Sequence, residues 1–198
     1  MSDDDSPSPA AVLRSLVARA IDADLASLGD RIEVVERGSG SAGDDAAGGD
    51  SATPAGRLAD LVGEADSVVA VVPRFDPDLA RRLNAALAAE DDGAGGQTDA
   101  ASAPRDVRVV FTGSAADRLS GATGPVVRRA LADRGVHAYR HDGESPVAVA
   151  LGDDRAVVAL IDEAGVAAVL WTDDPSVREW VAATCQRYLD AAEPVTDG

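Results

Sequence analysis

Short apolar segments alternate with helix-forming segments through the second half of this chain. Val68–Val72 is apolar throughout and Val107–Phe111 nearly so, which is typical of strands in a sheet covered on both faces. Segments with apolar residues three or four positions apart connect these strands to each other and to a third at Val136–Arg140. This order of elements predicts βαβ units, and therefore a parallel sheet with right-handed crossovers.

The pattern changes in the last third of the chain. Three strand-like runs, Val147–Leu151, Ala156–Ile161 and Val166–Trp171, are separated by short polar turns, and Asp174 and Pro175 then open a helix. Turns this short make neighbouring strands antiparallel. The sequence therefore predicts an α/β fold with a mixed sheet, in which an N-terminal parallel βαβ part precedes an antiparallel C-terminal meander and a closing C-terminal helix.

Segments rich in glycine and aspartate divide the chain into parts. Their composition predicts flexible connections, because a compact domain rarely contains long structureless loops. We expect a disordered acidic tail, an N-terminal helix (10–28) with a short strand, a flexible linker, and an α/β sensor-like domain with a flexible insert at 91–105. The predicted boundaries of these four parts are 1–9, 10–37, 38–53 and 54–194.

The charge of the chain is strongly acidic. There are 35 acidic residues against 18 basic ones, and every basic residue is arginine, which gives a net charge of -17. Such a chain repels itself at low ionic strength, whereas molar salt shortens the Debye length to about 3 Å. Hydrophobic residues make up 45% of the chain and lie in periodic runs, which disfavours a disordered acidic protein. We therefore predict a globular, halophilic protein that folds in molar salt and does not bind nucleic acid directly.

Cysteine usage and hydropathy bear on the compartment. Cys185 is the single cysteine, so no internal disulfide can form. No apolar run approaches the ~20 residues that cross a membrane, and the acidic start is unlike a signal peptide. These features predict a cytoplasmic protein with no membrane contact.

Motifs that carry chemistry lack the context they need. Gly38–Gly43 fits the G-x-G-x-x-G pattern, but Asp44 and Asp45 follow where a phosphate-binding helix would begin, which indicates a linker. His137 and His141 lie on a predicted strand and its exit, about 13 Å apart, too far for a metal pair. No G-x-S-x-G elbow is present. We expect no catalytic residue, no cofactor and no metal.

One cluster suggests a ligand site. Three of the six aromatic residues lie at or just beyond the ends of predicted strands, with polar residues beside the first two. Ligands of open α/β sheets bind beyond the carboxyl ends of the parallel strands. An alternative is that these aromatic rings only cap the core. The ligand-binding residues predicted here are Arg74, Phe75, Asp76, Thr112, Ser114 and Trp171.

Several segments match a known family pattern. A strand runs into a proline at 68–73, a V-x-V-V-x-T strand occupies 107–112, and a D-D-x-x-V-V-A-L strand occupies 153–160. The closing helix carries Trp180 and Tyr188. From about Thr53 the chain resembles the effector-sensing (phospholipase D-like) domain of archaeal TrmB-like winged-helix transcription regulators and the middle domain of the methanogenesis regulatory protein.

This resemblance implies a non-catalytic regulatory or sensor domain. Its partner would be a small-molecule effector, another protein or a second copy in a homodimer. The chain departs from the pattern in having only about 30 structured residues before the linker, too few for a winged helix. It also has no lysine, so the His-x-Lys signature of phospholipase D-like enzymes is missing. The alternative function is a structural interaction module that docks through its N-terminal helix.

Overall fold

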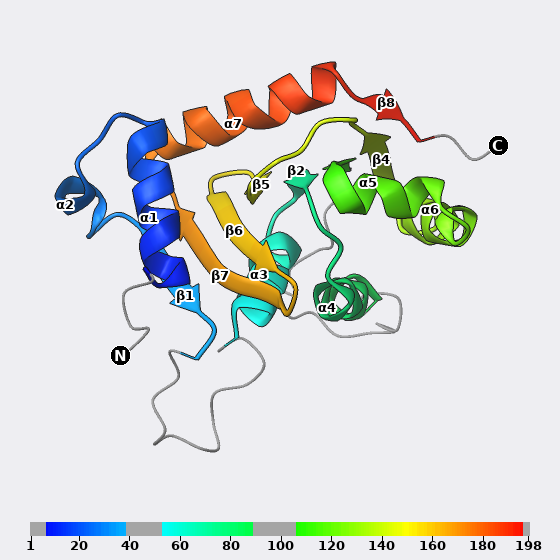
Figure 1. Cartoon of the computed structure of the whole chain (residues 1–198), viewed down its shortest axis with the longest axis horizontal. Coiled ribbons are helices and arrows are strands. Elements are labelled where there is room, and N and C mark those ends of the chain that lie inside the picture. The colour runs from blue at the N-terminus through cyan, green and yellow to red at the C-terminus, as the bar shows by residue number, and fades with distance from the viewer. Residues whose placement is uncertain (1–6, 39–52, 89–105, 196–198) are drawn as a thin grey trace, which may run out of the picture.

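The computed structural model describes residues 7–38, 53–88 and 106–195. They form one eight-stranded sheet in the order β1-β7-β6-β5-β2-β3-β4-β8. Helices cover both of its faces (Figure 1). The strands are β1 (Glu33–Glu36), β2 (Ser67–Val72), β3 (Asp106–Phe111), β4 (Val136–Arg140), β5 (Ala148–Leu151), β6 (Ala156–Asp162), β7 (Gly165–Thr172) and β8 (Glu193–Pro194).

The pairing of the strands confirms the predicted fold class. β2, β3 and β4 are parallel neighbours, whereas β5, β6 and β7 form an antiparallel meander joined by short turns. β5 pairs antiparallel with β2 and links the two halves of the sheet. β6 consequently runs parallel to β2, so the end of β6 and the start of β7 lie at the same edge of the sheet as the end of β2.

The helices form two layers on opposite sides of the sheet (Figure 1). α1 and α7 pack on one face, while α3, α4 and α6 lie on the other. The helices are α1 (Pro9–Ala20), α2 (Leu25–Leu28), α3 (Pro54–Gly63), α4 (Pro77–Ala88), α5 (Gly113–Ser120), α6 (Gly124–Ala132) and α7 (Pro175–Asp190).

Capping residues fix where helices begin. The Thr53 hydroxyl accepts the N–H of Gly56 at 3.1 Å and begins α3, with Pro54 at the first helical position. Asp174 begins α7, because one carboxylate oxygen accepts two backbone N–H groups and the other pairs with Arg31 at 3.2 Å. α7 therefore starts at a fixed place beneath the last strand.

The structure differs from the sequence-based expectations in three elements. The helix expected at 10–28 is broken into α1 and α2, and Asp22 between them has a positive φ of 52°. α5 begins at Gly113, where only a loop was expected, and β8 was not predicted. Both are short, and neither spans enough residues for a clear periodic signal.

The segment expected to precede the linker shares the main sheet. β1 pairs antiparallel with β7, and α1 buries Leu13 and Val17 completely in the core beneath it. The predicted linker 38–53, the insert 91–105 and the tail 1–9 fall almost entirely outside the described residues. Of the helices that the structure describes, none is both long and apolar enough to cross a membrane.

Candidate functional site

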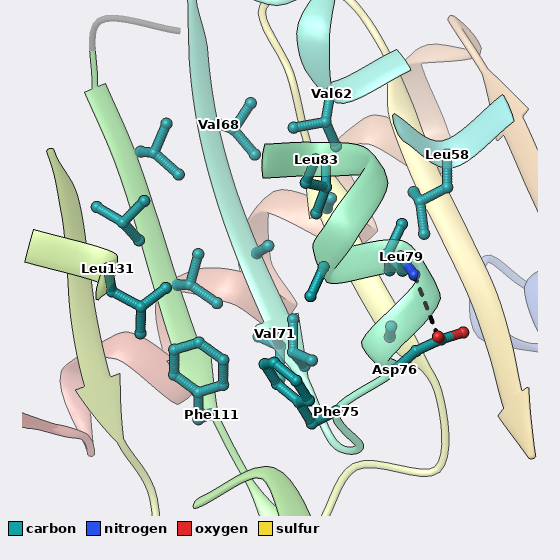
Figure 2. Close-up of a pocket in the computed structure, with 18 of the residues that line it drawn as sticks. Leu58, Val62, Val68, Val71, Phe75, Asp76, Leu79, Leu83, Phe111 and Leu131 are labelled. Atoms are coloured by element: carbon teal, nitrogen blue, oxygen red, sulfur yellow. Dashed lines mark hydrogen bonds between the residues drawn. The ribbon is translucent and has the colours of Figure 1, made fainter. Parts of the chain in front are cut away.

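An apolar cavity of about 320 Å³ lies on one face of the sheet, between α4 and α6 (Figure 2). Its floor is formed by side chains of β2, β3, β5 and β6, and its walls are formed by α3, α4 and α6. Figure 2 shows the leucine side chains of the walls facing the floor and two phenylalanine rings side by side at one end. Residues that line the cavity include Leu58, Val62, Val68, Ala70, Phe75, Leu79, Leu83, Val107, Val109, Phe111, Val126, Ala130, Leu131, Ala148, Ala150 and Ala159.

The hollow follows from how the helices are placed. α4 packs beside α3, and α6 packs against β4, so the central strands between them are left without a helix directly above. The floor is partly alanine, for example Ala70, Ala148 and Ala150, whose small side chains do not fill this space. On the rim, 72% of Val126 is exposed to solvent.

Asp76 holds the carboxyl end of β2 in place. One oxygen accepts the N–H groups of Asp78 at 2.8 Å and Leu79 at 3.1 Å, so the side chain caps the start of α4 (Figure 2). The other oxygen accepts the N–H of Val166 at 3.0 Å, at the start of β7. Gly165 has a φ of 104°, and a Cβ there would lie 2.6 Å from this oxygen. Asp76 is therefore a positioning residue that ties α4 to the β6–β7 turn.

Two phenylalanines close the cavity at this edge of the sheet. Phe75 follows β2 and Phe111 ends β3, and both side chains line this end of the cavity (Figure 2). The guanidinium of Arg118, on α5, lies 5.3 Å from the centre of the Phe75 ring. This distance is within the range of a cation–π contact. The aromatic end of the cavity is thus covered by a positive charge.

A polar groove adjoins the cavity beyond this edge. Arg74, Phe75, Asp76 and Ile161 line both hollows, and the groove adds Ser114 and Arg118 from α5 together with the turn 162–165. In that turn, Asp162 binds the guanidinium of Arg37 through two contacts of 3.1 and 3.2 Å. This hydrogen bond lowers the pKa of Asp162, and the charges of Arg37 and Arg74 act in the same direction.

The structure gathers four of the six predicted ligand-binding residues around these hollows: Arg74, Phe75, Asp76 and Ser114. Thr112 is fully buried at the end of β3 and lines neither hollow, and its hydroxyl has no hydrogen-bond partner. That the six residues bind a ligand stays a prediction.

Trp171 lies at the opposite edge of the sheet. Because β7 runs antiparallel to β6, its end lies beside the start of β6, where Trp171 faces Val157. The indole N–H donates to Glu33 at 3.2 Å, and the guanidinium of Arg57 lies 4.6 Å from the ring. The ring belongs to the apolar cluster beneath α3 and does not line the cavity.

Sequence reasoning missed most of the cavity. The apolar positions of α4 and α6 were visible at helical spacing, but such spacing does not distinguish residues that fill a core from residues that line a hollow. Arg118 gave no signal, because its helix was not expected. Within the part of the chain that the structure describes, no three His, Cys, Asp or Glu side chains are placed to hold a metal ion.

Comparison with known proteins supports the regulatory relationship. Residues 97–191 match the family model of the middle domain of the methanogenesis regulatory protein FilR1. This match confirms the resemblance found in the sequence. The match covers β3 through α7, which includes α5, α6 and part of the cavity floor. A search of curated proteins finds no match.

Solved structures show which fold this is. Nuc, a phospholipase D family member from Salmonella typhimurium, aligns with a TM-score of 0.51 and 15% identity, over 82% of this chain and 96% of its own. TrmBL2, an archaeal chromatin protein, aligns at 0.47 and 15% identity over 92% of this chain, which spans 59% of TrmBL2. NucT from Helicobacter pylori aligns at 0.49 and 13% identity, over 70% of this chain and 88% of its own. At these identities the similarity to Nuc establishes the fold alone.

Proposed function

We propose that this chain is a non-catalytic regulatory domain, related to transcription regulators, that binds a small apolar effector in the cavity between α4 and α6. The observation that carries the proposal is an open apolar cavity in a domain whose second half matches a regulatory middle domain. Ligand pockets in proteins occupy about 300–1,000 Å³ and are lined mainly by hydrophobic and aromatic side chains.

The cavity suits ligand binding in energetic terms. Its lining is almost entirely aliphatic and aromatic, with Arg74, Asp76 and Arg134 as its charged members. Each Å² of apolar ligand surface removed from water contributes about 25 cal/mol, and filling a hollow that already exists requires little rearrangement. An apolar effector would also cover Val126, which now faces solvent.

The residues present do not favour catalysis. The fold is shared with a phospholipase D family member, but this chain contains no lysine and so has no His-x-Lys pair. Asp76 lines the cavity, but its carboxylate already accepts hydrogen bonds from three backbone N–H groups and so is held in a structural role. The alternative of docking through the N-terminal helix loses support, since Leu13 and Val17 are buried against the chain's own sheet.

Binding of an uncharged fluorescent probe tests the proposal. N-phenyl-1-naphthylamine should bind the protein saturably at about 3 M KCl, where self-repulsion is screened. Ala130 lines the cavity and Ala132, on the same helix, is exposed and does not. Ala130→Phe should weaken binding at least about tenfold by filling the hollow, whereas Ala132→Phe should not change it. Equal binding by all three proteins would contradict the proposal.

A further inference from the structure

We propose that the effector is an amphipathic anion, whose apolar body fills the cavity and whose acid group lies in the adjoining groove between Arg74 and Arg118. This inference rests on the proposed function and specifies the ligand class. The two hollows meet at Arg74, Phe75 and Ile161, so one molecule can occupy both. A ligand that fills the apolar part must pass its polar end across Phe75 towards the groove.

Neither arginine of the groove is held by an ion pair to a described residue. The chain has 35 acidic and 18 basic residues, so carboxylates are available to its guanidiniums. Among the described residues, Arg31, Arg37, Arg81, Arg108, Arg129, Arg140 and Arg155 do so within 4 Å. Arg74 and Arg118 make no such ion pair in the part of the chain described. Arg118 lies over the Phe75 ring, and Arg74 is exposed.

The carboxylates that border the groove are mostly engaged elsewhere. Asp162 binds Arg37 and the N–H of Ala164, and Asp78 pairs with Arg81 at 2.8 Å. Asp76 is buried and its oxygens accept three N–H groups. Glu163 is exposed at the outer rim. The groove therefore offers two guanidiniums whose hydrogen-bonding edges are not taken up by these acids.

The start of α5 adds to the positive potential. α5 begins at Gly113, and Thr112 before it makes no side-chain cap. The N–H groups of Gly113 and Ala115 donate to the carbonyls of Gly143 and Pro73, so the helix end contributes through its partial positive charge and not through free donors. Ser114, in the first turn, also lines the groove and offers a hydroxyl donor.

An acidic head group satisfies these groups better than the other ligand classes do. A neutral apolar molecule would fill the cavity but leave both guanidiniums unpaired. A cation would be repelled by Arg74 and Arg118. A carboxylate or sulfonate can accept paired N–H bonds from the planar guanidinium of Arg74, which lysine could not provide in the same geometry.

A matched pair of ligands tests the charge directly. We would titrate 4-phenylbutyrate and its uncharged amide into the full chain by calorimetry at about 3 M KCl, since contacts in a partly buried site are screened less than surface ones. The acid should bind at least about fivefold more tightly than the amide, because hydrogen bonds to charged groups are the stronger kind. Arg74→Gln should remove most of this preference and Arg74→Gln with Arg118→Gln all of it.

A control variant keeps the test specific. Arg129→Gln removes an exposed guanidinium of α6 that pairs with Asp133 and lines neither hollow, so the acid should keep its affinity. Equal affinity for acid and amide, or no effect of Arg74→Gln, would overturn the inference. So would failure of both ligands in a protein whose binding of N-phenyl-1-naphthylamine is blocked by Ala130→Phe. Failure of both ligands with normal probe binding would leave the proposed function standing. Absence of probe binding in the parent protein would reject the proposed function and this inference together.

Discussion

The two faces of the sheet are packed differently. On the α1–α7 face, Leu13, Val17, Val177 and Val181 are fully buried, and a groove of about 540 Å³ lies between the two helices. Beneath α4 and α6 the wall residues are only partly buried and a cavity remains. Protein interiors normally approach crystal density, so side chains that are fully buried contribute most to stability. The contrast leads us to expect that Leu13 contributes more to stability than the leucines that line the cavity.

Leucine truncations on the two faces should give the largest difference. Leu13 is fully buried beneath α1, so Leu13→Ala opens a closed void there and should lower the free energy of unfolding by about 3 kcal/mol. Leu83 already borders an open cavity. Leu83→Ala should therefore cost less than about 1 kcal/mol, because little contact is lost and no closed void forms. Denaturant unfolding of both variants at fixed high salt makes the comparison, and similar losses would show that the faces are equally packed.

Asp76 joins the open face to the meander, and its removal should have the next largest effect. Asp76→Ala leaves three backbone N–H groups without their acceptor, one of them buried, and should cost about 2 kcal/mol. Asp78→Ala, two residues away, breaks only an exposed pair with Arg81 and should cost about 0.5 kcal/mol or less. Thermal unfolding of both variants provides the measurement. A mild Asp76→Ala variant would mean that water replaces the carboxylate.

The smallest expected effect is the pH dependence of the stability contributed by Asp162, at the edge of the cavity face. The hydrogen bond from Arg37 lowers the pKa of Asp162 below its usual value of 3.8, so this carboxylate stabilises the folded state above pH 3.8. The stabilisation is lost as the pH falls through the lowered value. Because 49% of the Asp162 side chain is exposed, the contribution should be no more than about 0.5 kcal/mol.

Asp162→Asn isolates this contribution. The variant should be slightly less stable than the parent protein near neutral pH, and the difference should vanish in acid. Chemical unfolding of both proteins at several pH values, with salt held constant, would show it. A difference that persists at low pH would point to lost hydrogen bonding with Ala164 instead of lost charge.

Much of the fold was predictable because its strands carry strong local signals. β2 and β3 are apolar runs, and the short turns before β6 and β7 dictate antiparallel pairing. α5 was missed because it has eight residues and begins with Gly113 and Ser114, which usually indicate a loop. The break after α1 was missed because the apolar spacing continues across it.

The candidate site was predictable only in part. The topological rule placed Arg74 and Phe75 correctly beyond the end of β2, because that edge follows from the order of the strands. The cavity itself depends on the distance between α4 and α6, which no local pattern encodes. Trp171 was misplaced for a related reason. Its position at the end of a strand was predictable, but the edge of the sheet at which it lies depends on the direction of β7.

The two tryptophans of this chain lie on opposite faces of the sheet. Trp171 belongs to the cluster beneath α3, and Trp180, on α7, packs against the core beneath α1 and α7. Each face therefore contains its own intrinsic fluorophore. With Trp180 replaced by phenylalanine, emission would come from the α3 face alone, and with Trp171 replaced it would come from the α1–α7 face. The natural sequence thus allows the loosening of each layer to be followed optically without an added label.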